Sequence, residues 1–221
     1  VHANAGSGLR SYAQIGHGGA ALGDPGASPG SNEGNIALVA DLGVQLNAGA
    51  GDQAYVQVGH GGADSRGDSL GFVTVVTDQN DITLQTTTGT GSTAQIGHGG
   101  HNNDSNHAGS ISVIAEGSVS VTASVDNGAI IGHGSANLNA DGDLSGGLNI
   151  WAGEEIQLVD GSANGAFVSH QSSGTINYQR RGAGIAGDSG YSLVSVLDHG
   201  FSPTSHQVTG ATGGITLAET M

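Results

Sequence analysis

One short phrase recurs along this chain and restricts the folds open to it. Its copies read AQIGHGG at 13–19, VQVGHGG at 56–62, AQIGHGG at 94–100, AIIGHG at 129–134 and, in degraded form, AFVSH at 166–170. Successive histidines of the phrase are 43, 38, 35 and 37 residues apart. Repeats of this length indicate one supersecondary unit stacked on copies of itself. The sequence therefore predicts an elongated stack of repeats, and the spacing of the histidines is that of a repeat and not of an active site.

Each repeat contains three short segments in which apolar and other residues alternate. The first segment starts at Ile36, Val73, Ile111 and Leu148, the second at Val44, Ile82, Val119 and Ile156, and the third ends in the histidine. A period of two, β-branched residues and Gly, Asp or Asn at the boundaries predict strands. We therefore predict an all-β, right-handed parallel β-helix (β-solenoid) of about five coils with three strands each, its hand following the preference of parallel crossovers. Two coils per repeat stay an alternative.

The rhythm of the repeat fails after His170. We predict β-solenoid repeats over 1–170, an enlarged insertion over 171–213, such as a hairpin lying over the stack, and the start of a next coil over 214–221. Neither end resembles the caps that protect open strand edges. The sequence therefore predicts a segment of a longer array, continued axially either covalently or by docking.

The charge balance excludes several partners. Lys and Arg total 4 against 19 Asp and Glu, a formal charge of −15, so nucleic acid and anionic membranes are repelled. The chain has no cysteine and hence no disulfide or thiolate zinc site. No apolar run approaches the roughly 20 residues of a membrane span, so we expect no membrane insertion.

The strand pattern Gly-x-Ile-x-Val-x-Ala and the phrase YAQIGHGG at 12–19 resemble the repeats of filamentous-haemagglutinin-type bacterial adhesins exported by two-partner secretion. The resemblance covers nearly all of the chain outside 171–213. It implies an extracellular or cell-surface fibre shaft with a structural or adhesive role. It does not name a ligand, and a host or cell-surface receptor or a carbohydrate is a candidate partner. It supplies no catalytic residue and no cofactor.

Two other functions stay open beside the shaft. One is a subunit of a homopolymeric extracellular filament that assembles end to end, and the other is a carbohydrate-active β-helix enzyme. Carboxylates gathered on one face would indicate the enzyme. Here they are scattered, and four basic residues offer little to an acidic polysaccharide. We expect no enzyme.

The repeated histidines are predicted to stack in one column, about 5 Å apart, at a corner of the coil. The column comprises His17, His60, His98, His133 and His170. We interpret it as structural, with neutral imidazoles that hydrogen-bond backbone in one repeated tautomer and hold no metal. Metal binding and a pH switch are the alternatives, with His101 and His107 in the loop that follows His98. Gln14, Gln57 and Gln95 are predicted to form an outward ladder of stacked amides.

Two surface features are candidates for binding. Val39, Val76, Ile114 and Trp151 are apolar at outward positions, which predicts either a lateral interface between shafts or a surface covered by the chain's own loops. Arg66, Gly67 and Asp68 are predicted in a projecting loop that could present Arg-Gly-Asp to a receptor. Acidic loops such as 141–143 leave calcium as an alternative to the expected absence of any cofactor.

Overall fold

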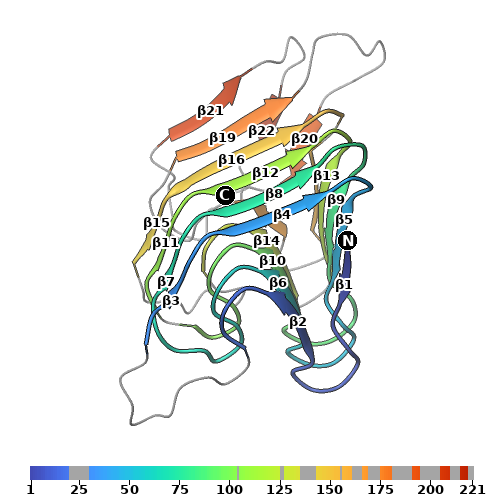
Figure 1. The fold of residues 1–221 in the computed structure, drawn as a ribbon. Helices are drawn as coiled ribbons and strands as arrows, with labels where there is room; N and C mark the ends of the chain where they lie inside the picture. Colours follow the sequence, from blue (N-terminus) through green and yellow to red (C-terminus); the bar gives the residue numbers. More distant parts are fainter. Residues whose placement is uncertain are drawn as a thin grey trace.

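The structure is a computed structural model of the 221-residue chain. It describes residues 1–19, 30–103, 105–124, 127–134 and 143–154 and, after these, the strands β17 to β22. Every described element is a β-strand, so the described residues contain no helix long and apolar enough to cross a membrane (Figure 1).

All but two of the described strands form four parallel sheets that run along the stack. The front sheet, which faces the viewer in Figure 1, contains β4 (Ile36–Ala40), β8 (Val73–Thr77), β12 (Ile111–Ala115), β16 (Gly147–Ala152), β19 (Thr175–Arg180) and β21 (Ser205–Thr209). The side sheet contains β1 (His2–Asn4), β5 (Val44–Asn47), β9 (Ile82–Gln85), β13 (Val119–Ala123) and β17 (Ile156–Asp160). The histidine sheet contains β2 (Tyr12–Ile15), β6 (Tyr55–Val58), β10 (Thr93–Ile96), β14 (Gly128–Ile131) and β18 (Ala166–Val168).

A fourth, short sheet was not predicted. It contains β3 (Asn32–Glu33), β7 (Ser69–Leu70), β11 (His107–Ala108) and β15 (Leu144–Ser145). Each of its strands lies just before a strand of the front sheet. Three complete turns of four strands therefore follow one another along the chain, from β3 to β14.

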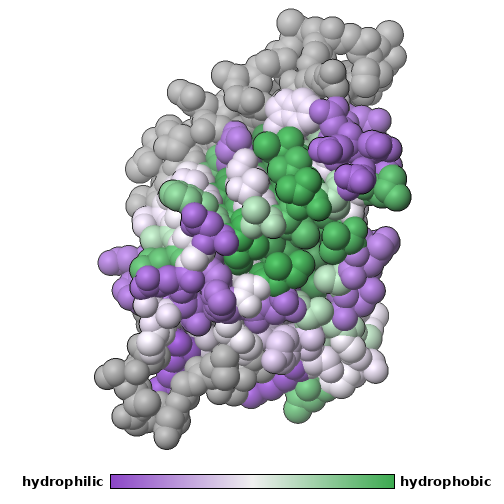
Figure 2. All heavy atoms as spheres, in the orientation of Figure 1, coloured by the Kyte–Doolittle hydropathy of each residue, from purple (hydrophilic) through white to green (hydrophobic). Residues whose placement is uncertain are grey.

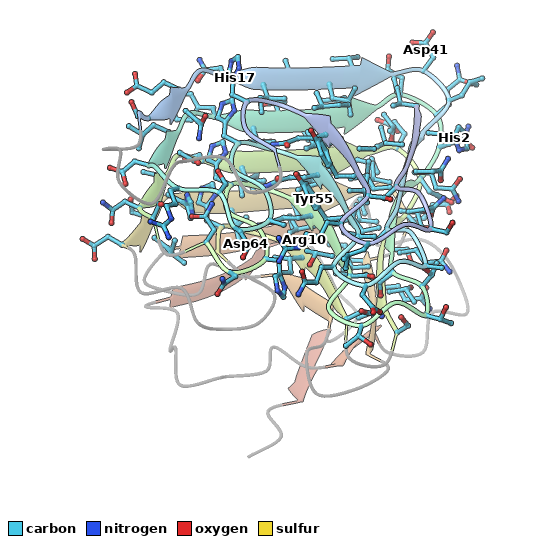
Figure 3. All side chains as sticks on the ribbon, turned by 90° about the horizontal axis from the view of Figure 1, so that it is seen from below. His2, Arg10, His17, Asp41, Tyr55 and Asp64 are labelled. Atoms are coloured by element: carbon cyan, nitrogen blue, oxygen red, sulfur yellow. The ribbon has the colours of Figure 1, made fainter. Side chains whose placement is uncertain are left out.

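The predicted parallel β-solenoid is confirmed, with one coil per repeat. Ile36, Val73, Ile111 and Leu148 occupy one column of the front sheet, as the repeat predicts. The two-coil alternative is wrong, because neighbouring coils pair a whole repeat apart. In Figure 3, seen from the N-terminal end of the stack, His2, Arg10, His17 and Asp41 follow one another clockwise while later coils recede, which makes the solenoid right-handed.

The interior of the coils is filled by the inward residues of three sheets. Val75 and Val113 of the front sheet, Leu84 of the side sheet and Val58 and Ile96 of the histidine sheet are fully buried in a single apolar cluster. Burying such a side chain stabilises the fold by about 1.5–3 kcal/mol. Because each coil alone would expose this face, the coils are stable only as a stack.

Part of the predicted insertion extends the stack instead. Strand β19 pairs with β16 in parallel, with Gln179 opposite Trp151, and β21 pairs with β19. The expected hairpin over the stack is therefore wrong for these strands, which continue the front sheet. Strand β22 (Ile215–Ala218) pairs in parallel with β20 (Tyr191–Val194). The domain boundaries themselves stay a prediction, since most of 171–213 lies outside the described residues.

Candidate interaction face and the histidine column

The predicted histidine column is present at the turn that follows the histidine sheet. The rings of His17, His60, His98 and His133 stack with centroids 5.0, 4.9 and 4.8 Å apart. The last three rings are parallel within 4° and buried, whereas His17 is exposed at the end of the stack (Figure 3). His170 lies outside the described residues.

Backbone groups hold each buried ring at both nitrogens. The Nδ1 of His98 accepts a hydrogen bond from the backbone N–H of His60 (3.0 Å), and its Nε2 donates to the carbonyl oxygen of Gly71 (2.9 Å). The neighbouring rings make the same two bonds. His60 accepts from His17 N–H (2.9 Å) and donates to Gly34 O (2.8 Å). His133 accepts from His98 N–H (3.0 Å) and donates to Gly109 O (2.8 Å). An Nδ1 that accepts from an N–H requires the neutral tautomer with hydrogen on Nε2.

Electrostatics favours the same neutral form. Burial, partly offset by the bond to Gly71 and reinforced by His60, lowers the pKa of His98 to about 4. Burial likewise lowers the pKa of His60, against the effect of its bond to Gly34. Since both nitrogens of the buried rings are occupied by backbone, neither has a free lone pair for a metal ion. The geometry therefore favours the structural interpretation over metal binding.

The sequence did not reveal the glycines that accept these bonds. They are Gly34, Gly71 and Gly109, each two residues before the first apolar residue of a front-sheet strand, and Gly146 occupies the same place in the next coil. All four have φ between +136° and +143°, which favours glycine, and this backbone turns the carbonyls of the first three toward the rings. Their constant offset from the next strand was the signal available in the sequence.

The glutamine column is a set of backbone clamps and not an exposed amide ladder. The Nε2 of Gln95 lies 3.1, 3.0 and 3.1 Å from the carbonyl oxygens of His98, Gly132 and Gly134, so one amide ties two coils together. Gln57 repeats the pattern, and both side chains are buried. Both point away from the apolar core, so another part of the chain must cover them.

The loops after the histidines provide this cover. A Cβ atom added at Gly62 would lie 2.7 Å from the Tyr55 hydroxyl, which places that loop directly over the histidine sheet. Burial, together with the neighbouring Tyr12, raises the pKa of the Tyr55 hydroxyl. Below Tyr55 in the view of Figure 3, Arg10 Nη2 and Asp64 Oδ2 form an ion pair of 3.0 Å between two loops. The histidine sheet is thus buried on both faces.

The front sheet has an open outer face. Val39, Val76, Ile114 and Trp151 share one outward column, as predicted. Val39 is 63% exposed, and the other three are half-buried. Figure 2 shows apolar atoms gathered over β4, β8, β12 and β16, bordered by hydrophilic residues. No described segment covers this stripe, so of the two predicted uses the lateral interface fits better.

An acidic edge runs beside the apolar stripe. Asp41, Asp78 and Glu116 follow directly after β4, β8 and β12 and are exposed. On the other side of the stripe lies a column of small or polar residues, namely Ala37, Thr74, Ser112 and Asn149. The face therefore suits a partner that presents an apolar surface to the stripe and places no negative charge opposite the acidic edge.

The Arg-Gly-Asp tripeptide is not in a projecting loop, contrary to the prediction. Gly67 is buried and its N–H donates to Ser105 Oγ (2.9 Å). The Asp68 carboxylate accepts from the backbone N–H of Asn106 (3.1 Å), and its carbonyl oxygen accepts from Asn32 N–H. Only Arg66 is exposed. The segment is part of the coil-to-coil bonding, and receptor binding by it stays a prediction.

Other candidates for chemistry find little support. Among the described residues, no three His, Asp or Glu side chains gather in a group that could hold a metal ion. The acidic loop at 141–143 lies outside them except for Asp143. Neither a family model, nor a curated protein, nor a solved structure matches this chain. The resemblance to filamentous-haemagglutinin-type adhesins therefore stays a prediction.

Proposed function

We propose that this chain is a rigid structural segment of an extracellular fibre shaft, with an adhesive side face. The observation that supports this most is what the repeated residues do. In three consecutive coils the histidine and glutamine of the phrase bind backbone of their own or an adjacent coil. The repeated residues thus form the same set of hydrogen bonds between each pair of coils. A rod that carries load needs such a connection in every coil, whereas a catalytic site needs its residues in one place only.

The open face of the front sheet supplies the adhesive part of the proposal. Each strand contributes about five residues of about 3.3 Å, and four coils stack about 4.8 Å apart, so the stripe region covers only a few hundred Å². A stable interface needs about 800 Å² per partner. One segment therefore packs weakly against another, and lateral bundling becomes strong only where several such faces act together.

Charge adds a further condition on bundling. With −15 overall, two copies repel each other, and salt screens this repulsion at distances beyond about 8–10 Å. We therefore expect lateral association to strengthen with ionic strength. An ion-paired interface would weaken instead.

Sedimentation of the 221-residue chain over a range of concentrations and salt tests this face. Replacing Trp151 by Ser should lower the association constant severalfold and leave the unfolding midpoint nearly unchanged, because Trp151 points outward. Asn149→Ser, in the adjacent outward column, is the matched control and should change neither. Unchanged association in Trp151→Ser would remove the lateral interface from the proposal.

Pulling on single molecules tests the rod itself. A stack of equivalent coils should yield coil by coil, each step releasing one repeat, or about 120 Å of extended chain. A single rupture at low force would contradict the shaft. Turnover of a polysaccharide by the purified chain would favour the enzyme instead.

A further inference from the structure

His107 is a buried histidine that the stacked column does not use. It starts β11 of the short sheet and is fully buried. Neither of its ring nitrogens has a hydrogen-bond partner among the described residues. His98, equally buried, has both nitrogens bonded to backbone. An imidazole without partners is tolerated in such a place only while it carries no charge.

The charged and titratable groups around His107 come from three sides. Asp68 precedes β7 in the preceding coil, Asp143 precedes β15 in the next coil, and His98 lies in the turn after the histidine sheet. Asp68 already accepts a hydrogen bond from Asn106 N–H, and Asp143 is exposed. Among the described residues, neither carboxylate makes a hydrogen bond with the ring, so a proton on His107 would be a buried charge without a hydrogen-bonded partner.

We propose that residues 105–109 form an acid-sensitive latch, which is closed while His107 is neutral and opens when the ring takes up a proton. Opening moves His107 into water and separates Asn106 N–H from the Asp68 carboxylate. Two backbone bonds to the next coil break with it, from His107 N–H to Asp143 O and from Gly109 N–H to Ser145 O. Two from the preceding coil break as well, from Ser69 N–H to Asn106 O and from Gly71 N–H to Ala108 O. The latch is independent of the proposed shaft function.

The direction of the pH effect follows from the burial of the ring. Burial, aided by His98 and opposed by Asp68, lowers the pKa of His107 to about 4, against 6.5 for a ring in water. The closed state is thus fully favoured above pH 6.5 and loses stability as the pH falls toward 4. At pH 5 the open fraction should be about 30-fold higher than at pH 7.5, since only the open state is protonated there.

The chain itself supplies the variants for a test. The residues that pair with His107 in register are Ser69 in the preceding coil and Leu144 in the next coil, and both are buried. His107→Leu and His107→Ser therefore place at this position residues that equivalent turns already accommodate. The turn at 31–34, whose Asn32 and Gly34 amides donate to the 67–71 turn and not to 105–109, serves as an internal reference.

Hydrogen exchange of backbone amides between pH 7.5 and 5, corrected for intrinsic rates, measures the opening. In the parent chain the opening constant of 105–109 should rise about 30-fold relative to 31–34, and in His107→Leu this rise should vanish. If His107→Leu does not fold, His107→Ser replaces it, and the comparison of the two turns in the parent chain decides independently. An equal rise in both turns, or a rise that persists in the folded variant, would overturn the latch.

Discussion

The histidine sheet and the front sheet belong to the same coils but differ in what covers their outer faces. In β6, β10 and β14 every residue is buried, whereas in β8 and β12 buried and half-buried residues alternate. The histidine sheet lies between the core and its own loops, and the front sheet lies between the core and solvent. This difference explains which residues repeat.

The side-chain N–H groups of an outward residue under a loop must find acceptors inside the protein, so the identity of this residue is restricted in each coil. Gln14, Gln57 and Gln95 accordingly recur with the same carbonyl partners. An outward residue in solvent has no such restriction, and Ala37, Thr74, Ser112 and Asn149 share one column of the front sheet. In this chain, an outward residue that recurs in each coil is one that loops cover. Candidate binding residues lie at outward positions whose identity varies between coils.

The largest loss of stability is expected from adding a side chain where the backbones of two coils approach closely, at the turn that follows the histidine sheet. A Cβ at Gly97 would lie 2.1 Å from the carbonyl oxygen of Gly132, and the residue has φ of +139°. Gly97→Ala should therefore lower the free energy of unfolding by roughly 3–5 kcal/mol, measured by chemical denaturation. Gly30→Ala, where a Cβ meets nothing within 4 Å, is the control. Equal stability of the two variants would show that the two coils are not tightly packed at this turn.

Removing one clamp should have a smaller effect. Gln95→Ala leaves three carbonyl oxygens without their side-chain donor in a buried setting, at a cost of about 2–3 kcal/mol. Gln85→Ala, on the exposed side of β9, should change stability by less than about 0.5 kcal/mol. Urea unfolding of the two variants measures the contrast. Similar losses from both would mean that coverage by loops does not matter.

The next smaller effect is expected from acid, which should lower the free energy of unfolding through the buried histidines of the column. His98 has a pKa of about 4 in the fold and 6.5 in the unfolded chain, so its contribution is complete above pH 6.5 and declines as the pH falls to 4. At pH 5 the loss amounts to about 2 kcal/mol. Urea unfolding of the His107→Leu variant at pH 7.5 and 5 excludes the contribution of His107 and measures that of His98 together with His60 and His101, whose pKa values burial also lowers. A free energy of unfolding that does not change between pH 7.5 and 5 would contradict the neutral column.

The smallest effect is expected on the open face. Val76→Thr keeps the shape of a half-buried side chain and should lower the free energy of unfolding by less than about 1 kcal/mol. Melting curves of this variant and of Thr74→Ala in the neighbouring outward column provide the measurement. A loss comparable with that of Gln95→Ala would show that this face is covered rather than open.

Much of the fold could be predicted because parallel coils repeat their register. The alignment of Ile36 with Val73 and of Val44 with Ile82 in the sequence is the pairing found in the sheets. The neutral tautomer of the column was also predicted, since a repeated imidazole beside glycines has backbone as its nearest partner.

The rest depends on contacts that a strand pattern does not report. Two-residue strands such as β7 are too short to show alternation, so the short sheet was missed. Cover by loops is a long-range property, which is why Gln57 was expected at the surface and His107 in the loop that follows His98. Gly67 and Asp68 were expected to project, but hydrogen bonds to the next coil hold them in the stack.

Nuclear magnetic resonance of the ring nitrogens tests the central claim most directly, namely that the repeated phrase is a joint and not a ligand site. For His60, His98 and His133 at pH 6 we predict the neutral tautomer with hydrogen on Nε2. We also predict couplings across hydrogen bonds from the backbone nitrogens of His17, His60 and His98 to Nδ1 of the ring in the next coil. Rings with hydrogen on Nδ1, charged rings, or ring signals that shift on adding zinc would contradict it.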